Sequence, residues 1–182
     1  AITNFEVCKD NYIVLQFPSQ NNIASLKVLD EEGREYSNIQ LTEGQVINIS
    51  ISKKHNLIGI NTLMVENKME SRLLIYDIEG QLIGSNNLEE QLALGFMYDA
   101  KGNMIVVKEE EVISINKNNK TLWEVNLDKI SLFDGFSSDY MVFYGGTEAR
   151  KGLINGNAED QIKILQYNGK IIGETKLEEK VN

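Results

Sequence analysis

The side chains that could carry catalysis are few in this chain. It contains one histidine, His55, and one cysteine, Cys8, among 182 residues. A histidine-rich metal centre is therefore excluded, and a Ser-His-Asp or Cys-His site would have to be built on His55. His55 stands in the segment Lys53-Lys54-His55-Asn56, where we expect a turn with a surface histidine. Cys8 has no partner for an internal disulfide, and we expect it to be a small buried residue of a strand.

Carboxylates are plentiful, but no motif brings two of them to a common site. The run Lys108-Glu109-Glu110-Glu111 offers three carboxylates without the Asp-x-Asp-x-Asp-Gly frame of a calcium loop. Consecutive residues of a strand or turn point in different directions, so we predict a charged hairpin tip there. The segment 99–102 is likewise expected to be a plain turn. The sequence predicts no catalytic residue, no metal site and no cofactor.

The composition limits the classes of partner. Charged residues make up 25% of the chain and hydrophobic residues 42%, as in a folded domain. The net charge of -9 opposes binding to nucleic acid or to an anionic membrane, because such surfaces need clustered Lys and Arg. No apolar run approaches the roughly 20 residues of a membrane helix. We therefore expect no nucleic-acid partner and no membrane insertion of this segment.

A turn residue is followed eight positions later by a leucine four times along the chain. These pairs are Gly33 and Leu41, Gly80 and Leu88, Asn119 and Leu127, and Gly169 and Leu177. Successive markers lie 47, 39 and 50 residues apart, so the offset persists while the distance between units changes. Gly and Asn supply the positive φ that tight hairpins require. The pattern indicates four copies of one hairpin.

A second series of turn residues precedes apolar runs at Asn11, Asn56, Asn103 and Asp139. Each unit is therefore expected to contain four strands, and no stretch holds a sustained helical stripe. The runs 12–15 and 104–107 are continuous and apolar, which is typical of a middle strand buried on both faces. The sequence predicts an all-β fold, a β-propeller-like array of four four-stranded antiparallel blades at about 2–43, 44–90, 91–129 and 130–180.

These units resemble blades of β-propellers of the quinoprotein-like and WD-repeat-like kind, across nearly the whole chain. The segment from Ile115 to Trp123 resembles the turn and tryptophan of a quinoprotein-like docking motif. The other units have Tyr36, Ile83 or Ile172 near that place, and none carries the Trp-Asp pair of WD repeats. The resemblance implies a propeller fold, and it does not extend to quinone binding.

Binding residues are expected in the connection between the second and third strands of each unit. The two marker series are separated by 22, 24, 16 and 30 residues, and we assign this variation to loops that gather on one face. The longest loop would run from Gly145 to Gln161, with a solvated insertion as the alternative to a binding loop. The next would run from Asn61 to Arg72, where an extended hairpin that packs on itself is the favoured alternative. Their candidate binding residues are Glu148, Arg150, Lys151, Asn155, Asn157, Met64 and Met69.

Two functions of different classes fit this architecture. The first is a non-catalytic binding or assembly module that recognises a protein or a cell-surface polymer such as a glycan. The second is a propeller hydrolase or lyase that acts on a glycan or lactone with carboxylates in its channel. Four blades are few for a closed propeller, so we expect half of a larger one, truncated or completed as a homodimer. The abundance of Asn, Ile and Lys favours a bacterial source. The single cysteine fits either a reducing compartment or a disulfide-poor bacterial exterior, and of these an extracytoplasmic location is favoured.

Overall fold

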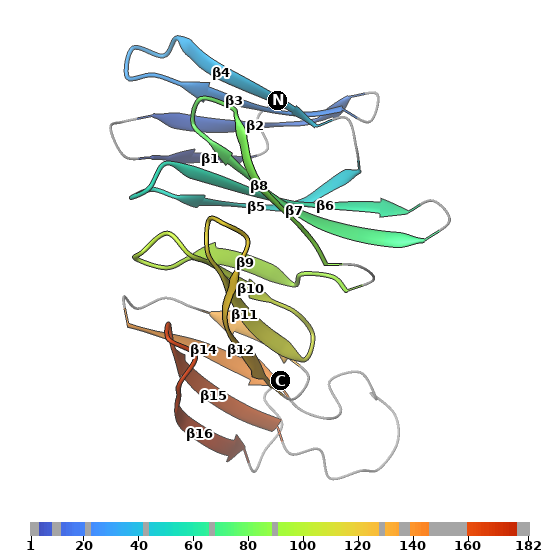
Figure 1. Cartoon of the computed structure of the whole chain (residues 1–182), viewed down its shortest axis with the longest axis vertical. Helices are drawn as coiled ribbons and strands as arrows, with labels where there is room; N and C mark the ends of the chain where they lie inside the picture. The colour runs from blue at the N-terminus through green and yellow to red at the C-terminus, as the bar shows by residue number, and fades with distance from the viewer. Residues whose placement is uncertain are drawn as a thin grey trace.

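The structure, a computed structural model, contains sixteen strands in four antiparallel sheets of four strands each (Figure 1). It describes residues 4–8, 12–20, 23–41, 44–65, 68–88, 91–127, 130–134, 139–145 and 160–177. None of these segments forms a helix, and so none supplies a helix that could cross a membrane. The all-β class and the four four-stranded units that the repeat predicts are confirmed.

Strands follow one another in chain order within each sheet. The first sheet consists of β1 (Asn4–Val7), β2 (Ile13–Gln20), β3 (Ile23–Leu29) and β4 (Glu35–Leu41). The second consists of β5 (Gln45–Ser52), β6 (Leu57–Val65), β7 (Met69–Asp77) and β8 (Leu82–Asn87). The third consists of β9 (Gly95–Tyr98), β10 (Met104–Val107), β11 (Glu111–Ile115) and β12 (Thr121–Asn126). The fourth consists of β13 (Ile130–Asp134), β14 (Tyr140–Gly145), β15 (Asp160–Gln166) and β16 (Ile171–Leu177).

The antiparallel order divides the connections between the two ends of the strands in each sheet. Turns from the first to the second strand and from the third to the fourth lie at one end of the strands, which we call the turn edge. Connections from the second to the third strand, together with the links between sheets, lie at the opposite edge, which we call the loop edge. Any site built from the connections that vary between units therefore belongs to the loop edge.

The four sheets stack in chain order, with the first and the last at opposite ends of the array (Figure 1). Apolar cores fill the three interfaces. Strand β10 shows how a middle sheet serves two of them. Met104 and Val106 pack toward the second sheet while Ile105 and Val107 pack toward the fourth, and all four are at most 1% exposed. The period of two along a strand makes this possible, and the expected burial of this run on both faces is confirmed.

All four turn markers of the sequence adopt the same left-handed backbone. Their φ angles are 79° at Gly33, 82° at Gly80, 63° at Asn119 and 83° at Gly169. In each turn the marker amide donates to the carbonyl three residues earlier, over distances between 2.9 and 3.2 Å. The offset found in the sequence is therefore the trace of one turn geometry used four times.

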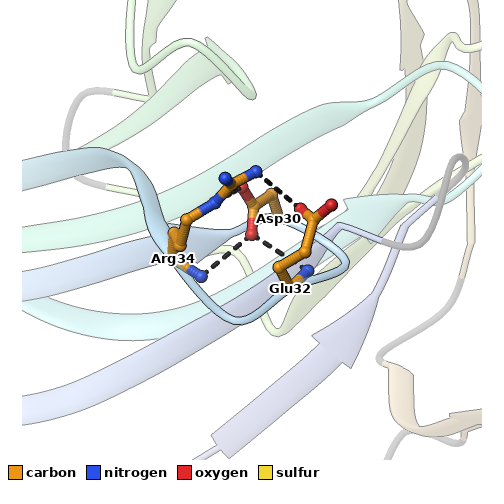
Figure 2. Close-up of polar contacts among 3 residues, drawn as sticks. All are labelled: Asp30, Glu32 and Arg34. Atoms are coloured by element: carbon orange, nitrogen blue, oxygen red, sulfur yellow. Dashed lines mark hydrogen bonds and ion pairs between the residues drawn. The ribbon is translucent and has the colours of Figure 1, made fainter.

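In the first of these turns a side chain holds the backbone in place (Figure 2). Asp30 Oδ1 accepts from the amides of Glu32 and Arg34 at 3.1 and 2.9 Å, and Asp30 Oδ2 accepts from Arg34 Nε at 2.8 Å. Desolvation opposes ionisation of the Asp30 carboxyl, but the bonds from Arg34 hold its pKa below the ordinary value. Asp77 and Asn116, three positions before the next two markers, accept backbone amides of their turns in the same way.

The turns of the second, third and fourth sheets also dock on the sheet before them. The residue four positions after the marker lies on the fourth strand and meets a carbonyl two positions before the marker of the next sheet. Ser37 Oγ donates to the Ile78 carbonyl at 2.6 Å, and Trp123 Nε1 donates to the Tyr167 carbonyl at 3.0 Å. We call this contact the inter-sheet latch. The tryptophan that resembles a docking residue in the sequence therefore docks the fourth sheet on the third.

A glycine occupies the latch position at the middle junction. A Cβ built on Gly84 would lie 3.7 Å from the Lys117 carbonyl, so the following turn approaches at the same place. A side-chain bond replaces the missing donor, because Asn119 Nδ2 donates to the Ser85 carbonyl at 2.8 Å. The latch therefore keeps its backbone geometry while its side chains differ from junction to junction.

The unequal spacing between the two marker series arises in large part from strand length, so its assignment to loops alone is wrong. Strands β6 and β7 have nine residues each, whereas β10 has four and β11 has five. The predicted loop at 61–72 is in large part strand, because β6 continues to Val65 and β7 begins at Met69. An antiparallel hairpin can lengthen by paired residues without losing register. In the longest predicted loop, between Gly145 and Gln161, residues 146–159 lie outside the part of the chain that the structure describes.

Gly169→Ala is expected to destabilise the protein more than Gly33→Ala, although the two glycines have φ angles of 83° and 79°. A left-handed backbone costs an L residue about 1–2 kcal/mol at either site. A Cβ on Gly169 would lie 2.9 Å from Trp123 Cδ2, whereas nothing lies within 4 Å of one on Gly33. Overpacking adds about 1–3 kcal/mol. Urea unfolding should show this difference in the free energy of unfolding. Equal losses in the two variants would show that the close contact of Gly169 with Trp123 adds no cost.

Candidate functional site

A groove opens at the loop edge between the second and third sheets. One part is a cavity of about 580 Å³ lined by Met69, Gln91, Leu92, Leu94, Lys108, Glu109, Glu110, Glu111 and Asn126. A neighbouring cavity of about 700 Å³ shares Met69, Gln91, Lys108 and Glu111 with the first. It continues over Lys68, which precedes β7, and over residues of β7, β8 and β12, including Glu70, Asn86, Asn87 and Glu124. We call the two cavities together the acidic groove.

The acidic groove combines negative charge with exposed apolar surface. Its carboxylates belong to Glu70, Glu109, Glu110, Glu111 and Glu124, and its ammonium groups to Lys68 and Lys108. Leu92 and Leu94 are exposed for 39% and 41% of their surface, and Met69 is half-buried beside them. Exposed leucines rimmed by polar groups are typical of an interaction surface. The groove therefore suits a ligand with both positive charge and apolar bulk.

The acidic turn between β10 and β11 is held in place by its backbone. The Glu109 carbonyl accepts from the Ile130 amide at 2.7 Å, and the Glu110 carbonyl accepts from the Leu127 amide at 2.8 Å. These bonds fix the turn on the link between the third and fourth sheets. Lys108 Nζ pairs with a Glu111 carboxylate oxygen at the base of the groove. The turn presents the Glu110 carboxylate from a rigid support.

The opposite wall of the groove rests on a buried polar network. Ser71 Oγ donates to Asn61 Oδ1 at 2.9 Å, and Asn61 Nδ2 donates to the Ala93 carbonyl at 3.5 Å. Asn61 and Ser71 are fully buried, so these partners satisfy groups that would otherwise be costly to desolvate. Ala93 lies between Leu92 and Leu94. The network therefore positions the two leucines that line the groove.

The structure divides the predicted binding residues among three places. Met69 lines the acidic groove. Met64 packs instead on the link before β5, because a Cβ on Gly44 would lie 2.9 Å from Met64 Cγ. The remaining five lie outside the described residues, and their role stays a prediction: Glu148, Arg150, Lys151, Asn155 and Asn157.

Sequence reasoning missed Leu92 and Leu94, and it treated Glu109–Glu111 only as a hairpin tip. A usable signal was present in the repeat itself. The link that enters the third sheet and the β10–β11 turn of that sheet both lie at the loop edge. Leu92 and Leu94 could have been placed next to the acidic turn on that ground.

His55 and Cys8, the residues on which a nucleophilic site would depend, lie in different surroundings. His55 is exposed at the turn edge, where its ring lies over Gly102 and its Nε2 is 3.1 Å from the Ala100 carbonyl. Cys8 is buried in the first core. No group of three or more His, Cys, Asp or Glu side chains among the described residues could hold a metal ion. Among the first strands of the four sheets, β5 and β9 contain no carboxylate, whereas β1 contains Glu6 and β13 contains Asp134. Burial raises the pKa of the Tyr98 phenol on β9 above its ordinary value.

The fold is shared with known propellers. The chain superposes on the WD40 domain of Pan2 from Neurospora crassa with a TM-score of 0.61 and 12% identity, covering 96% of this chain and 52% of that one. The chain superposes on BamB from Moraxella catarrhalis with a TM-score of 0.62 and 12% identity, covering 94% of this chain and 47% of that one. For the β-propeller domain of the Trilobed protease from Pyrococcus furiosus, which has an open velcro topology, the TM-score is 0.63 and the identity 14%, with 99% of this chain and 57% of that one covered. The chain spans about half the length of these propellers.

These comparisons establish the fold and leave the activity open. At such low identity, similarity to the solved propellers shows architecture alone. No curated protein matches the chain in sequence. A model of a family described as a family of unknown function, DUF5711, matches residues 1–182.

Ser71→Ala is expected to destabilise the protein by about 1–3 kcal/mol, because it leaves the buried Asn61 Oδ1 without its donor. Ser85→Ala is the matched control, since Ser85 is exposed on the neighbouring strand β8. Its cost should stay within about 0.5 kcal/mol. Urea unfolding monitored by circular dichroism measures both. Equal effects would mean that the polar network does not support the groove wall.

Proposed function

The chain belongs to this family of unknown function, DUF5711, and we propose that it is a non-catalytic interaction module with a propeller-like fold. Its acidic groove binds a cationic, partly apolar segment of another protein. The observation that carries the proposal is the juxtaposition of exposed Leu92 and Leu94 with the carboxylates of the β10–β11 turn.

Charge selects the kind of partner. Five carboxylates and two ammonium groups line the groove, and the whole chain carries a net charge of -9. A positive segment is therefore attracted from a distance and held at the groove, whereas a polyanion is repelled. Because the groove is open to water, each exposed ion pair adds little affinity by itself. Selectivity for positive charge is the main electrostatic contribution.

Apolar contact supplies the rest of the binding free energy. Leu92, Leu94 and Met69 offer a surface on which aliphatic side chains or the stems of Lys and Arg can pack. A lysine or arginine can lay its stem on the leucines while its charged end reaches the carboxylates of Glu109 and Glu110. Methionine adapts its shape to different partners, which suits a recognition surface.

The hydrogen bonds that hold the two walls of the acidic groove favour a binding function over a catalytic one. Backbone bonds to Glu109 and Glu110 and the buried Asn61–Ser71 network hold both walls before a partner arrives. A preformed surface loses little conformational entropy on association. A paired-carboxylate hydrolase or lyase, the alternative from sequence, would need two carboxylates on the first strands of the sheets. Strands β5 and β9 lack Asp and Glu, whereas β1 and β13 carry one each, Glu6 and Asp134.

Fluorescent peptides of equal length, one alternating lysine with leucine and one alternating glutamate with leucine, provide the test. Anisotropy titration should show binding of the Lys-Leu peptide alone, with affinity that falls as salt is added. The double variant Leu92→Ser, Leu94→Ser should weaken binding by at least about tenfold, equivalent to about 1.4 kcal/mol. Glu110→Lys should also weaken it, because it reverses a charge in the groove.

The control variant is Glu79→Lys, which makes the same charge change at the turn edge. It should leave the affinity for the Lys-Leu peptide unchanged. Equal weakening by Glu79→Lys and Glu110→Lys would mean that only the net charge matters. Equal binding of both peptides, or an unaffected double-leucine variant, would contradict the assignment of the groove as the binding site.

A further inference from the structure

We propose that the acidic groove holds its partner as an extended chain, and that the Asn86 side chain pairs with the main chain of that segment. The inference rests on the proposed function, because it concerns how the same groove binds the cationic segment of another protein. It follows from comparing the residues that occupy one repeat position on β4, β8 and β12.

The middle junction has a polar side chain where the other two junctions have an aliphatic one. The position lies six residues after the turn marker, on the fourth strand of the sheet. It is Ile39 at the first junction, 3% exposed in the first core, and Val125 at the third, packed against the third core. At the middle junction it is Asn86, which is half-buried. Asn86 pairs in register with Leu73 of the second core, so both side chains face the third sheet.

A cavity lies at the place where this aliphatic side chain is missing. The cavity of about 700 Å³ is lined by Asn86 and reaches Leu88 and Ile113 at the edge of the second core, which are 5% and 7% exposed. Glu124 pairs in register with Ile113 and so faces the second sheet from the opposite wall. Gly84, two positions before Asn86 on the same face of β8, adds no side chain to this space. The middle junction therefore leaves open a space that apolar side chains fill at the other two.

The width of this space favours an extended chain over a helix. The second and third sheets remain docked at the turn edge, where Asn119 Nδ2 donates to the Ser85 carbonyl at 2.8 Å. Stacked sheets lie about 10 Å apart, so a gap left by one missing layer of side chains is about as wide as one extended chain. An α-helix with its side chains is about 10–12 Å across and would have to push the sheets apart.

The groove also offers hydrogen-bonding groups that the fold does not use. The side chains of Asn86, Gln91 and Thr121 line it and make no hydrogen bond to any other part of the chain that the structure describes. A carboxamide carries both an acceptor oxygen and two N–H donors, so it can pair with the C=O and the N–H of a main chain. An extended chain leaves these groups available at its edges, whereas a helix pairs them internally. Asn86 is therefore suited to an extended segment.

The two cavities of the groove divide the contacts with such a segment. A chain that crosses both of them passes over the residues they share, which are Met69, Gln91, Lys108 and Glu111. Near the loop edge its cationic side chains meet the Glu110 carboxylate, and its apolar side chains pack on Leu92 and Leu94. Between β8 and β12 its main chain lies beside Asn86.

Anisotropy titration with ester analogues of the Lys-Leu peptide tests the main-chain contact. One analogue has esters in place of the amide bonds at the lysines and the other at the leucines, so each keeps every side chain and charge but loses half of its N–H donors. At least one analogue should bind wild type about tenfold more weakly than the amide peptide, because it leaves a carboxamide acceptor unpaired. Asn86→Ala should weaken the amide peptide and narrow its advantage over that analogue.

Ser85→Ala is the matched control on β8. Ser85 pairs in register with Leu74, which packs against the first core, so Ser85 faces away from the groove. This variant should bind all three peptides as wild type does. Circular dichroism should show an unchanged β spectrum for both alanine variants.

Asn86→Val separates binding from folding. It places at the middle junction the residue type found at Val125, so it should maintain or increase the free energy of unfolding measured in urea. The same variant should weaken the amide peptide by at least about tenfold, because it fills the space and removes the carboxamide. A Lys-Leu peptide of equal composition, with its leucines at helical spacing, should bind wild type more weakly than the alternating peptide.

The possible failures distinguish this inference from the proposed function. Equal affinity for the amide peptide and both ester analogues, or an unaffected Asn86→Ala variant, would overturn the inference alone if binding still depends on Leu92, Leu94 and Glu110. Tighter binding of the helically spaced peptide would mean that the groove holds a helix. No binding of any Lys-Leu peptide would overturn both the inference and the proposed function.

Discussion

Each sheet of this protein is apolar on two faces, and the whole architecture depends on that constraint. A strand such as β10 buries alternate residues in opposite directions, so its sheet gains stability only when another sheet covers each side. Stacking is the response of the chain to this requirement. It also means that no single sheet is a complete unit and that the two ends of any open stack are the parts left unsatisfied.

The same constraint decides where function can lie. Sheet faces are used for packing, so polar chemistry is left to the two edges. The turn edge repeats one tight geometry and is occupied by latches such as Ser37 with Ile78. The loop edge carries the connections that differ between units, and there the acidic turn at 108–111 meets Leu92 and Leu94. A groove at the loop edge is therefore the expected outcome of stacking sheets with unequal hairpins.

The sequence allowed the repeat to be predicted because local backbone stereochemistry restricts the residue types at the marker positions. Gly33, Gly80, Asn119 and Gly169 all need a left-handed backbone, and few residue types tolerate it, so the positions stay visible. Strand length was not visible. The long β6–β7 hairpin and the short β10–β11 hairpin differ in paired residues that obey the same alternation, so their spacing looked like loop variation. The groove was missed because it joins a link to a turn of the next sheet, and that contact depends on how the sheets stack.

The three junctions between sheets share one docking geometry but use three different residues for it. This explains why the fold and the binding site can be specified by separate residues. Ser37, Gly84 and Trp123 occupy the same latch position, yet each meets the following turn through the same backbone carbonyl position. Backbone geometry tolerates this divergence, so the chain keeps a propeller-like fold at 12–14% identity to solved propellers. Only side chains outside the latch and the cores are free to specify a partner. In the described residues, the acidic turn and the two leucines of the adjoining link form the clearest such set.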